Sequence, residues 1–219
     1  ETALRGINLK IQEGEKVAIL GRNGSGKSTL IKLASGLFKS SDGLVMYDGV
    51  DIRQLHTEDL SKSIGIVLQD VQLFSGSVKE NITMGRENIT QDDLVNAGKL
   101  SGLDEFISKV PGGYDLQLLD GGKGLSGGQR QAIALARSIV HKPSHFILDE
   151  PTSAMDMNAE NLFINQVRSL LQNSTMLIVT HRMPLLNLVD RIIVMNDGQI
   201  VEDGPKDQII QKLNPSSQS

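Results

Sequence analysis

A glycine-rich segment near the start of the chain has the composition of a loop that binds phosphate groups. Residues 21–28 match the pattern G-x-x-x-x-G-K-[ST] in full, with an apolar run before them and a helical pattern after them. Glycine lets the backbone turn tightly enough for successive N–H groups to point at phosphate oxygens, and the start of the following helix adds positive potential. We expect Lys27 to reach the β- and γ-phosphates and the Ser28 hydroxyl to bind Mg²⁺, roles that an ordinary glycine-rich turn would not need. The residues predicted to contact the nucleotide are Gly21, Arg22, Asn23, Gly24, Ser25, Gly26, Lys27, Ser28 and Thr29.

A second corner of serine and glycine lies farther along the chain, where residues 125–129 are Leu-Ser-Gly-Gly-Gln and precede a helical pattern. Serine and glycine at the start of a helix leave N–H donors with little side chain around them, which suits an anion. The alternative is a plain serine cap followed by a flexible glycine pair, which the complete phosphate loop elsewhere in the chain disfavours. The second predicted phosphate-binding element therefore consists of Ser126, Gly127, Gly128 and Gln129.

Two acidic residues, Asp149 and Glu150, end an apolar run at residues 146–148. In open α/β sheets ligands gather beyond the carboxyl ends of the strands, so two carboxylates there suit a metal ion and general-base chemistry better than plain solvation. Gln69 and His181 each follow another strand-like run. Neither residue indicates a function when it is taken alone.

Short apolar runs predict the strands that must position these side chains. Alternating residues at 7–11 predict a half-buried strand, and residues 17–20 predict a buried strand that leads into the phosphate loop. Further strands are predicted at 44–47, 64–68, 146–148, 176–179, 191–195 and 199–202, the last two forming a hairpin around the turn at 196–198. Helices are predicted over 28–37, from near Ser126, and over 158–171. Strands that alternate with helices indicate a mostly parallel sheet covered by helices.

From about residue 71 to about residue 142 the strand patterns disappear, and helical or loop patterns dominate. We therefore expect a single α/β domain of 219 residues, whose core is formed by about 1–70 and 143–213 and carries an inserted helical lobe at about 71–142. The hairpin adds an antiparallel β part, and the tail at 214–219 is expected to fray.

The composition excludes several classes of function. Hydrophobic residues make up 39% and charged residues 22%, an ordinary globular balance, and a net charge of -4 disfavours nucleic acid as the main partner. The chain has no cysteine, so disulfides and thiolate metal sites are excluded. No apolar run approaches the ~20 residues that cross a bilayer, so we expect this polypeptide to be soluble.

Taken together and in this order, the motifs resemble those of ABC-type ATPases, and residues 125–129 resemble the signature of that family. The resemblance covers nearly all of the chain and implies a P-loop NTPase (RecA-like) core. It implies that Asp149, Ser28 and Gln69 hold Mg²⁺, that Glu150 is the general base, and that His181 hydrogen-bonds the γ-phosphate. The catalytic residues so implied are Glu150, His181, Gln69 and Lys27, and the cofactors are ATP and Mg²⁺.

The resemblance also implies an arrangement of two subunits. Members of the family pack head to tail, so that each nucleotide lies between one phosphate loop and the signature of the other copy. Ser126, Gly127, Gly128 and Gln129 would then act in trans. Residues 153–156 resemble the loop that reaches across this dimer and ends at Asp156.

Residues 69–82 resemble the exporter form of the family, and residues 149–156 resemble type I secretion exporters. This implies a fused or associated transmembrane domain, a place on the cytoplasmic face of the inner membrane, and a secreted protein as the substrate of the full transporter. Two alternatives are an ABC ATPase with no membrane work and an ATP-sensing module with little turnover, although Glu150 and His181 favour turnover. Many members stack adenine on an aromatic residue upstream of this chain's first strand, and neither Tyr47 nor Tyr114 is placed to replace it.

Overall fold

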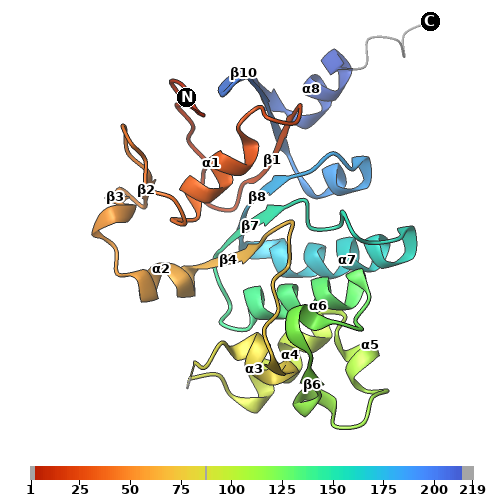
Figure 1. Ribbon diagram of the computed structural model, residues 1–219. Coiled ribbons are helices and arrows are strands. Elements are labelled where there is room, and N and C mark those ends of the chain that lie inside the picture. Colours follow the sequence, from red (N-terminus) through yellow and green to blue (C-terminus); the bar gives the residue numbers. More distant parts are fainter. Residues whose placement is uncertain (1–2, 87, 214–219) are drawn as a thin grey trace, which may run out of the picture.

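The computed structural model describes residues 3–86 and 88–213, and the predicted fraying of residues 214–219 lies outside them. A six-stranded sheet runs through the molecule in the order β10-β9-β1-β8-β7-β4, and every pair in it is parallel except β10 with β9 (Figure 1). The strands are β1 Lys16–Gly21, β4 Ile64–Val67, β7 His145–Asp149, β8 Thr175–Val179, β9 Arg191–Asn196 and β10 Gln199–Pro205. The mostly parallel sheet predicted from the sequence is confirmed.

Eight α-helices and several 3-10 turns connect the strands within the described residues. The α-helices are α1 Lys27–Ala34, α2 Thr57–Ser63, α3 Val78–Thr83, α4 Gln91–Ser101, α5 Asp104–Ile107, α6 Gly127–Ile139, α7 Met157–Leu170 and α8 Lys206–Leu213. The 3-10 turns are Ile52–Gln54, Gly113–Asp115, Asp120–Gly122, Leu171–Asn173 and Met183–Leu188. The first predicted helix ends three residues early, because Gly36 adopts the left-handed conformation (φ 74°) that stops it.

The two faces of the sheet bury different helices. Side chains such as Val17 and Ile19 of β1 pack with Ile31 of α1 on one face. Ala18, from the same strand, belongs to the cluster that contains Ile133 of α6 and residues of α4 and α7 on the other face. A strand covered on both faces is apolar along its whole length, which is why β1, β7 and β8 gave continuous apolar runs. α1 and α6 therefore lie on opposite sides of the sheet, as Figure 1 shows.

Residues 71–142 contain α3, α4, α5 and α6, together with a two-residue ladder between β5 Gly76–Ser77 and β6 Gln117–Leu118. This ladder lies in the stretch where strand patterns disappear from the sequence. A two-residue ladder is too short to produce a period in the sequence.

A buried asparagine ties the segment after β4 to α6. Asn81 is fully buried, and its side chain donates to the carbonyls of Phe74 and Ser77 and accepts from the N–H of Phe74. Arg137 of α6 donates to the carbonyls of Asn81 and Gln72. Because Asn81 and the Arg137 guanidinium are paired in this way, the chain beyond Gln69 is held against the helix that begins at Ser126.

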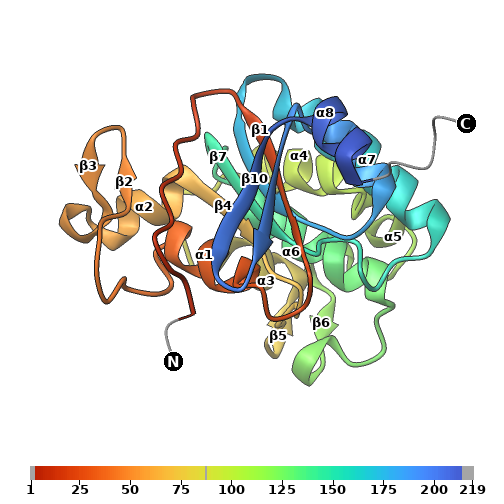
Figure 2. The ribbon, with the colours of Figure 1, turned by 90° about the horizontal axis from the view of Figure 1, so that it is seen from above.

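The predicted strand at residues 7–11 was wrong, and the predicted strand at 44–47 is shortened to β2 Met46–Tyr47, which pairs with β3 Val50–Asp51. Alternate side chains at 7, 9 and 11 pack against the α1 face of the core, so the alternation reported burial correctly. No strand among the described residues pairs with their backbone. Figure 2 shows the β2–β3 hairpin projecting from one end of the molecule, away from α5 and β6.

Candidate active site

The loop between β1 and α1 depends on glycine at two positions. Gly21 has φ 151°, and a Cβ there would collide with the carbonyl oxygen of Met195 on β9. Gly26 has φ 99°, and a Cβ there would come within 2.7 Å of the Leu4 side chain. Gly26 is also the N-cap of α1 and brings no side chain to cap it. No capping side chain therefore competes with an anion for the first N–H groups of the helix.

Lys27 is 7% exposed and lies inside the loop. Its Nζ donates to the carbonyl oxygens of Gly21, at 2.8 Å, and Arg22, at 2.9 Å. Burial lowers the pKa of this ammonium group, and the charges of Glu150 and Asp149 oppose that shift. The loop is thus shaped around a cation whose two partners are neutral carbonyls, which an anionic ligand could replace.

Asp149 ends β7 on the same edge of the sheet and is 5% exposed. Burial raises the pKa of its carboxyl, while a hydrogen bond from Ser28 and the charge of Lys27 lower it. Its Oδ1 is buried and, like the hydroxyl of Ser25, has no hydrogen-bond partner among the described residues. A buried carboxylate oxygen with no partner, next to a serine hydroxyl, fits Mg²⁺, which prefers oxygen ligands.

Glu150 and His181 face each other from neighbouring strands. Nε2 of His181 lies 3.4 Å from Oε1 of Glu150, and β7 and β8 run parallel with Asp149 opposite Val179. Glu150 has φ 47°, an uncommon conformation for a residue other than glycine, and its N–H donates to the carbonyl of Val179. A strained residue in a cluster of polar groups is typical of a functional site.

Lys27, Ser28, Asp149, Glu150 and His181 therefore come together where β1, β7 and β8 end. Gln69 lies just beyond β4, the strand next to β7, and is exposed. Its neighbour Asp70 is close enough to raise the pKa of Asp149.

Ser126 begins α6 with a complete capping box. Its hydroxyl accepts from the N–H of Gln129 at 3.1 Å, and its own N–H donates to Oε1 of Gln129 at 2.8 Å. The serine cap that the sequence offered as an alternative is thus present, and Ser126 nevertheless remains exposed. Because α6 and α1 cover opposite faces of the sheet, Ser126 and Lys27 start helices on different sides of it.

The loop at residues 153–156 touches the second corner. A Cβ on Gly127 would come within 2.5 Å of the carbonyl oxygen of Ala154. Asp156 caps α7 by accepting from the N–H of Ala159 at 2.9 Å. The residue predicted to reach a second copy therefore also starts a helix in its own.

Three polar residues close to this site were not predicted. The Thr152 hydroxyl donates to Glu160, and Glu160 pairs with Arg182, the residue that follows His181. One signal was available, since Glu160 precedes Phe163, Ile164 and Val167 at helical spacing and so lies on the buried face of α7. Glutamate is rarely buried without a partner, so its position indicated a hidden polar contact.

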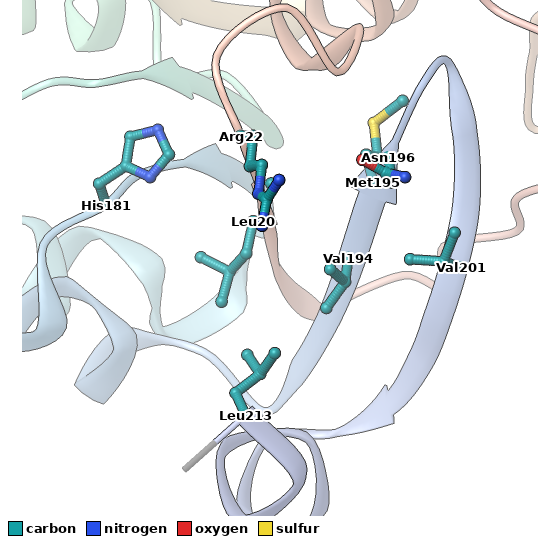
Figure 3. Close-up of a pocket in the computed structure, with 9 residues that line it drawn as sticks. Leu20, Arg22, His181, Val194, Met195, Asn196, Val201 and Leu213 are labelled. Carbon is teal, nitrogen blue, oxygen red and sulfur yellow. The ribbon is translucent and has the colours of Figure 1, made fainter.

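A cavity of about 700 Å³ opens beside the phosphate loop, lined mainly by apolar side chains of β1, β9, β10 and α8. Figure 3 shows Arg22 and His181 on one side of it and Leu213 on the other. Arg22 and His181 are therefore accessible from this cavity.

The two tyrosines make contacts within the fold. The Tyr47 hydroxyl donates to the carbonyl of Ala34 at 2.7 Å, and burial raises its pKa. Tyr114 packs against Gly98 of α4.

Comparison with known proteins places these motifs in context. Residues 4–153 match the family model described as ABC transporter. The cyclolysin secretion/processing ATP-binding protein CyaB of Bordetella pertussis is 41% identical over 95% of this chain and 29% of its own length. The leukotoxin export ATP-binding protein LtxB of Aggregatibacter actinomycetemcomitans is also 41% identical over 95% of this chain and 29% of its own length. A solved bacterial Atm1-family ABC exporter with ATP bound superposes with a TM-score of 0.89 and 31% identity, over 96% of this chain and 37% of that one. The chain thus spans less than a third of the length of these two relatives.

Proposed function

Because the chain belongs to the ABC transporter family, we propose that it is the ATP-binding and ATP-hydrolysing domain of an exporter. The observation that supports this function most directly is the convergence of a phosphate loop, a buried carboxylate and a Glu150–His181 pair at one edge of the sheet. The loop supplies the binding groups, and the pair supplies a base and a polar partner for the reaction.

In this proposal the triphosphate lies along residues 21–29, and the Lys27 ammonium exchanges its two backbone carbonyls for phosphate oxygens. Glu150 accepts a proton from the attacking water, and His181 hydrogen-bonds the γ-phosphate from the end of β8. The terminal P–O bond breaks, and ADP and inorganic phosphate are released. Gln69 lies at the end of β4, from which its amide can sense whether the γ-phosphate is present.

Asp149 and Ser28 would hold Mg²⁺ together with the nucleotide, with Gln69 as a further oxygen ligand. One carboxylate and one hydroxyl are few ligands for a free ion, and Mg²⁺ usually completes its shell with phosphate oxygens and water. Among the described residues no group of three or more His, Asp or Glu side chains forms a metal site. When bound, Mg²⁺ would neutralise charge on the β- and γ-phosphates.

The second phosphate-binding corner supports a dimer. Ser126, Gly127, Gly128 and Gln129 start a helix on the opposite face of the sheet from α1, the helix that follows the phosphate loop. In a head-to-tail pair each corner meets the nucleotide that the partner's loop binds, and Asp156 approaches the partner from the neighbouring loop. ATP would close the pair, and loss of the γ-phosphate would release it.

The transport role rests on the relatives. CyaB and LtxB carry secretion and export in their names, and the solved relative is an exporter. None of the helices in residues 3–86 and 88–213 has the length and apolar character to span a bilayer. We propose that this domain works with a fused or associated transmembrane domain on the cytoplasmic face of the inner membrane, in type I secretion of a protein substrate.

Purified protein assayed with Mg²⁺ and ATP tests the enzyme and the dimer together. We expect phosphate release whose rate per mole of protein rises with protein concentration, because only the dimer has complete sites. A specific rate independent of concentration would contradict the shared sites. ATP binding without turnover would favour the alternative of a sensing module.

A further inference from the structure

A chain of three polar residues connects the two loops that hold the catalytic pair, and the mechanism above gives none of them a role. Thr152 and Glu160 are only 1% and 5% exposed. The Thr152 hydroxyl donates to Oε1 of Glu160 at 2.7 Å, and Nη1 of Arg182 lies 3.3 Å from the other oxygen of that carboxylate. A buried carboxylate needs such partners, since an unpaired charge inside a protein is costly.

Both the backbone and the side chain of Arg182 make hydrogen bonds. Its N–H donates to the hydroxyl of the fully buried Thr180 at 3.0 Å. Its Nη2 donates to the carbonyl oxygens of Ser153 and Met155, each at 3.5 Å. The guanidinium group therefore bridges α7 and the loop at 153–156, while the backbone of Arg182 continues directly from His181.

Each of the two loops carries one member of the catalytic pair. Glu150 begins the first loop, and its carbonyl accepts from the N–H of Ser153 at 3.1 Å. His181 begins the second loop, and its ring is half exposed, so few neighbours restrain it. The Arg182 guanidinium group therefore ties the segment that continues from His181 to Glu160 and to the loop that follows Glu150.

We propose that Arg182, Glu160 and Thr152 are positioning residues that hold His181 against Glu150 and make this placement depend on the loop at 153–156. The inference rests on the proposed ATPase function and deepens it. A planar guanidinium group can contact the carboxylate and the loop carbonyls at once, whereas a lysine ammonium is a compact charge without that fork. A change in the loop that reaches toward the partner would then move His181 relative to Glu150.

Two substitutions that change side-chain size only slightly test this relay, by which Arg182, Glu160 and Thr152 position His181. Arg182→Lys keeps the charge and removes the fork, and Glu160→Gln removes the charge and keeps an acceptor for Thr152. We expect kcat for ATP hydrolysis to fall about 10- to 100-fold in each, because a catalytic group displaced by about 1 Å costs rate on that scale. KM should stay within about twofold, since the groups that bind ATP are untouched.

Conservative replacement separates positioning from mere folding. Thr152→Ser keeps the hydroxyl and should keep wild-type kcat, whereas Thr152→Val removes it and should behave like Glu160→Gln. Arg191→Lys is the matched control, because Arg191 of β9 pairs with Asp203 of β10 and with Glu15, which precedes β1, away from His181. This control should leave kcat unchanged.

The His181 ring gives a readout that needs no turnover. The chain has four histidines, and His181→Gln identifies the His181 ring signal in a ¹H–¹³C spectrum of nucleotide-free protein. We expect this signal to move in Arg182→Lys and Glu160→Gln, and to stay in place in Arg191→Lys. An unmoved signal, or a kcat equal to that of the wild type, would overturn the relay. A wild-type protein without ATPase activity would instead refute the proposed function, and the ring signal would still decide the relay.

Discussion

Nε2 of His181 lies 3.4 Å from Oε1 of Glu150, across the ends of two adjacent parallel strands. The pair indicates a catalytic site more strongly than either residue does alone, because a single carboxylate or a single histidine at a strand end is common on protein surfaces. Glu150 adopts the left-handed conformation at this position, and its N–H donates to the carbonyl of Val179. The backbone strain is therefore maintained by the neighbouring strand that leads to His181.

Replacing Glu150 by Gln should stop turnover and leave ATP binding intact. The amide has the size of the carboxylate and cannot accept the proton of the attacking water, so hydrolysis should fall about 10²- to 10⁴-fold. The variant should elute as a dimer from a sizing column with ATP and as a monomer without it. Glu58→Gln, in exposed α2, is the control and should hydrolyse ATP normally. Wild-type turnover by Glu150→Gln would place the base elsewhere.

Replacing Lys27 by Ala should weaken nucleotide binding at least about 10-fold. Each charge-assisted hydrogen bond to a phosphate oxygen contributes about 1.5–3 kcal/mol, and the variant loses those of a buried ammonium group. Titration with a fluorescent ATP analogue measures the effect, with the exposed Lys39→Ala as control. The variant also leaves the carbonyls of Gly21 and Arg22 without their donor, so its circular dichroism must be checked. Unchanged affinity in a folded variant would show that Lys27 does not contact the nucleotide.

His141 should make the stability of the domain depend on pH. Arg86 can only donate, so Nδ1 of His141 accepts from it at 3.0 Å, and the hydrogen is on Nε2, which is buried without a partner among the described residues. Burial and the charge of Arg86 lower the pKa of His141 from 6.5 to about 4. Between these values the unfolded chain binds a proton that the folded chain does not, so stability falls as pH drops.

We predict that the free energy of unfolding falls by about 1–2 kcal/mol between pH 6.5 and pH 4. This figure is smaller than the full pKa shift would give, because the ring is only part-buried. Urea unfolding at several pH values measures it. His141→Gln should remove this part of the slope and leave the contribution of the acidic residues. Equal slopes in the two proteins would mean that the ring is not held neutral by its surroundings.

The site was predictable wherever its chemistry requires a residue type at a fixed place in the chain. Gly21 and Gly26 have conformations that other residues adopt only with strain, and Asp149 and Glu150 follow a strand buried on both faces. Each of these requirements fixes a residue type at one position, so it can be recognised in the sequence.

The remaining features depend on contacts between distant segments. Alternation at residues 7–11 reports which side chains are buried and says nothing about whether a neighbouring strand is available. The Arg182–Glu160 contact joins residues from two elements, and only the position of Glu160 on the apolar face of α7 hinted at it. Ser126 caps α6 within one molecule. Serine caps many helices in this way, so the sequence around Ser126 does not by itself distinguish capping from phosphate binding.

In the proposed dimer, Ser126 to Gln129 of one molecule meet the nucleotide bound around Lys27 of another. Because the chain has no cysteine, Asn23→Cys and Ser126→Cys can be made separately in the Glu150→Gln background and then mixed. A short bis-maleimide, which alkylates one cysteine thiol at each end, should link the two variants into a heterodimer when Mg²⁺ and ATP are present. The link should be absent without nucleotide and when the partner instead carries Lys39→Cys. Failure to form this ATP-dependent link, in variants shown to bind ATP, would contradict the shared site.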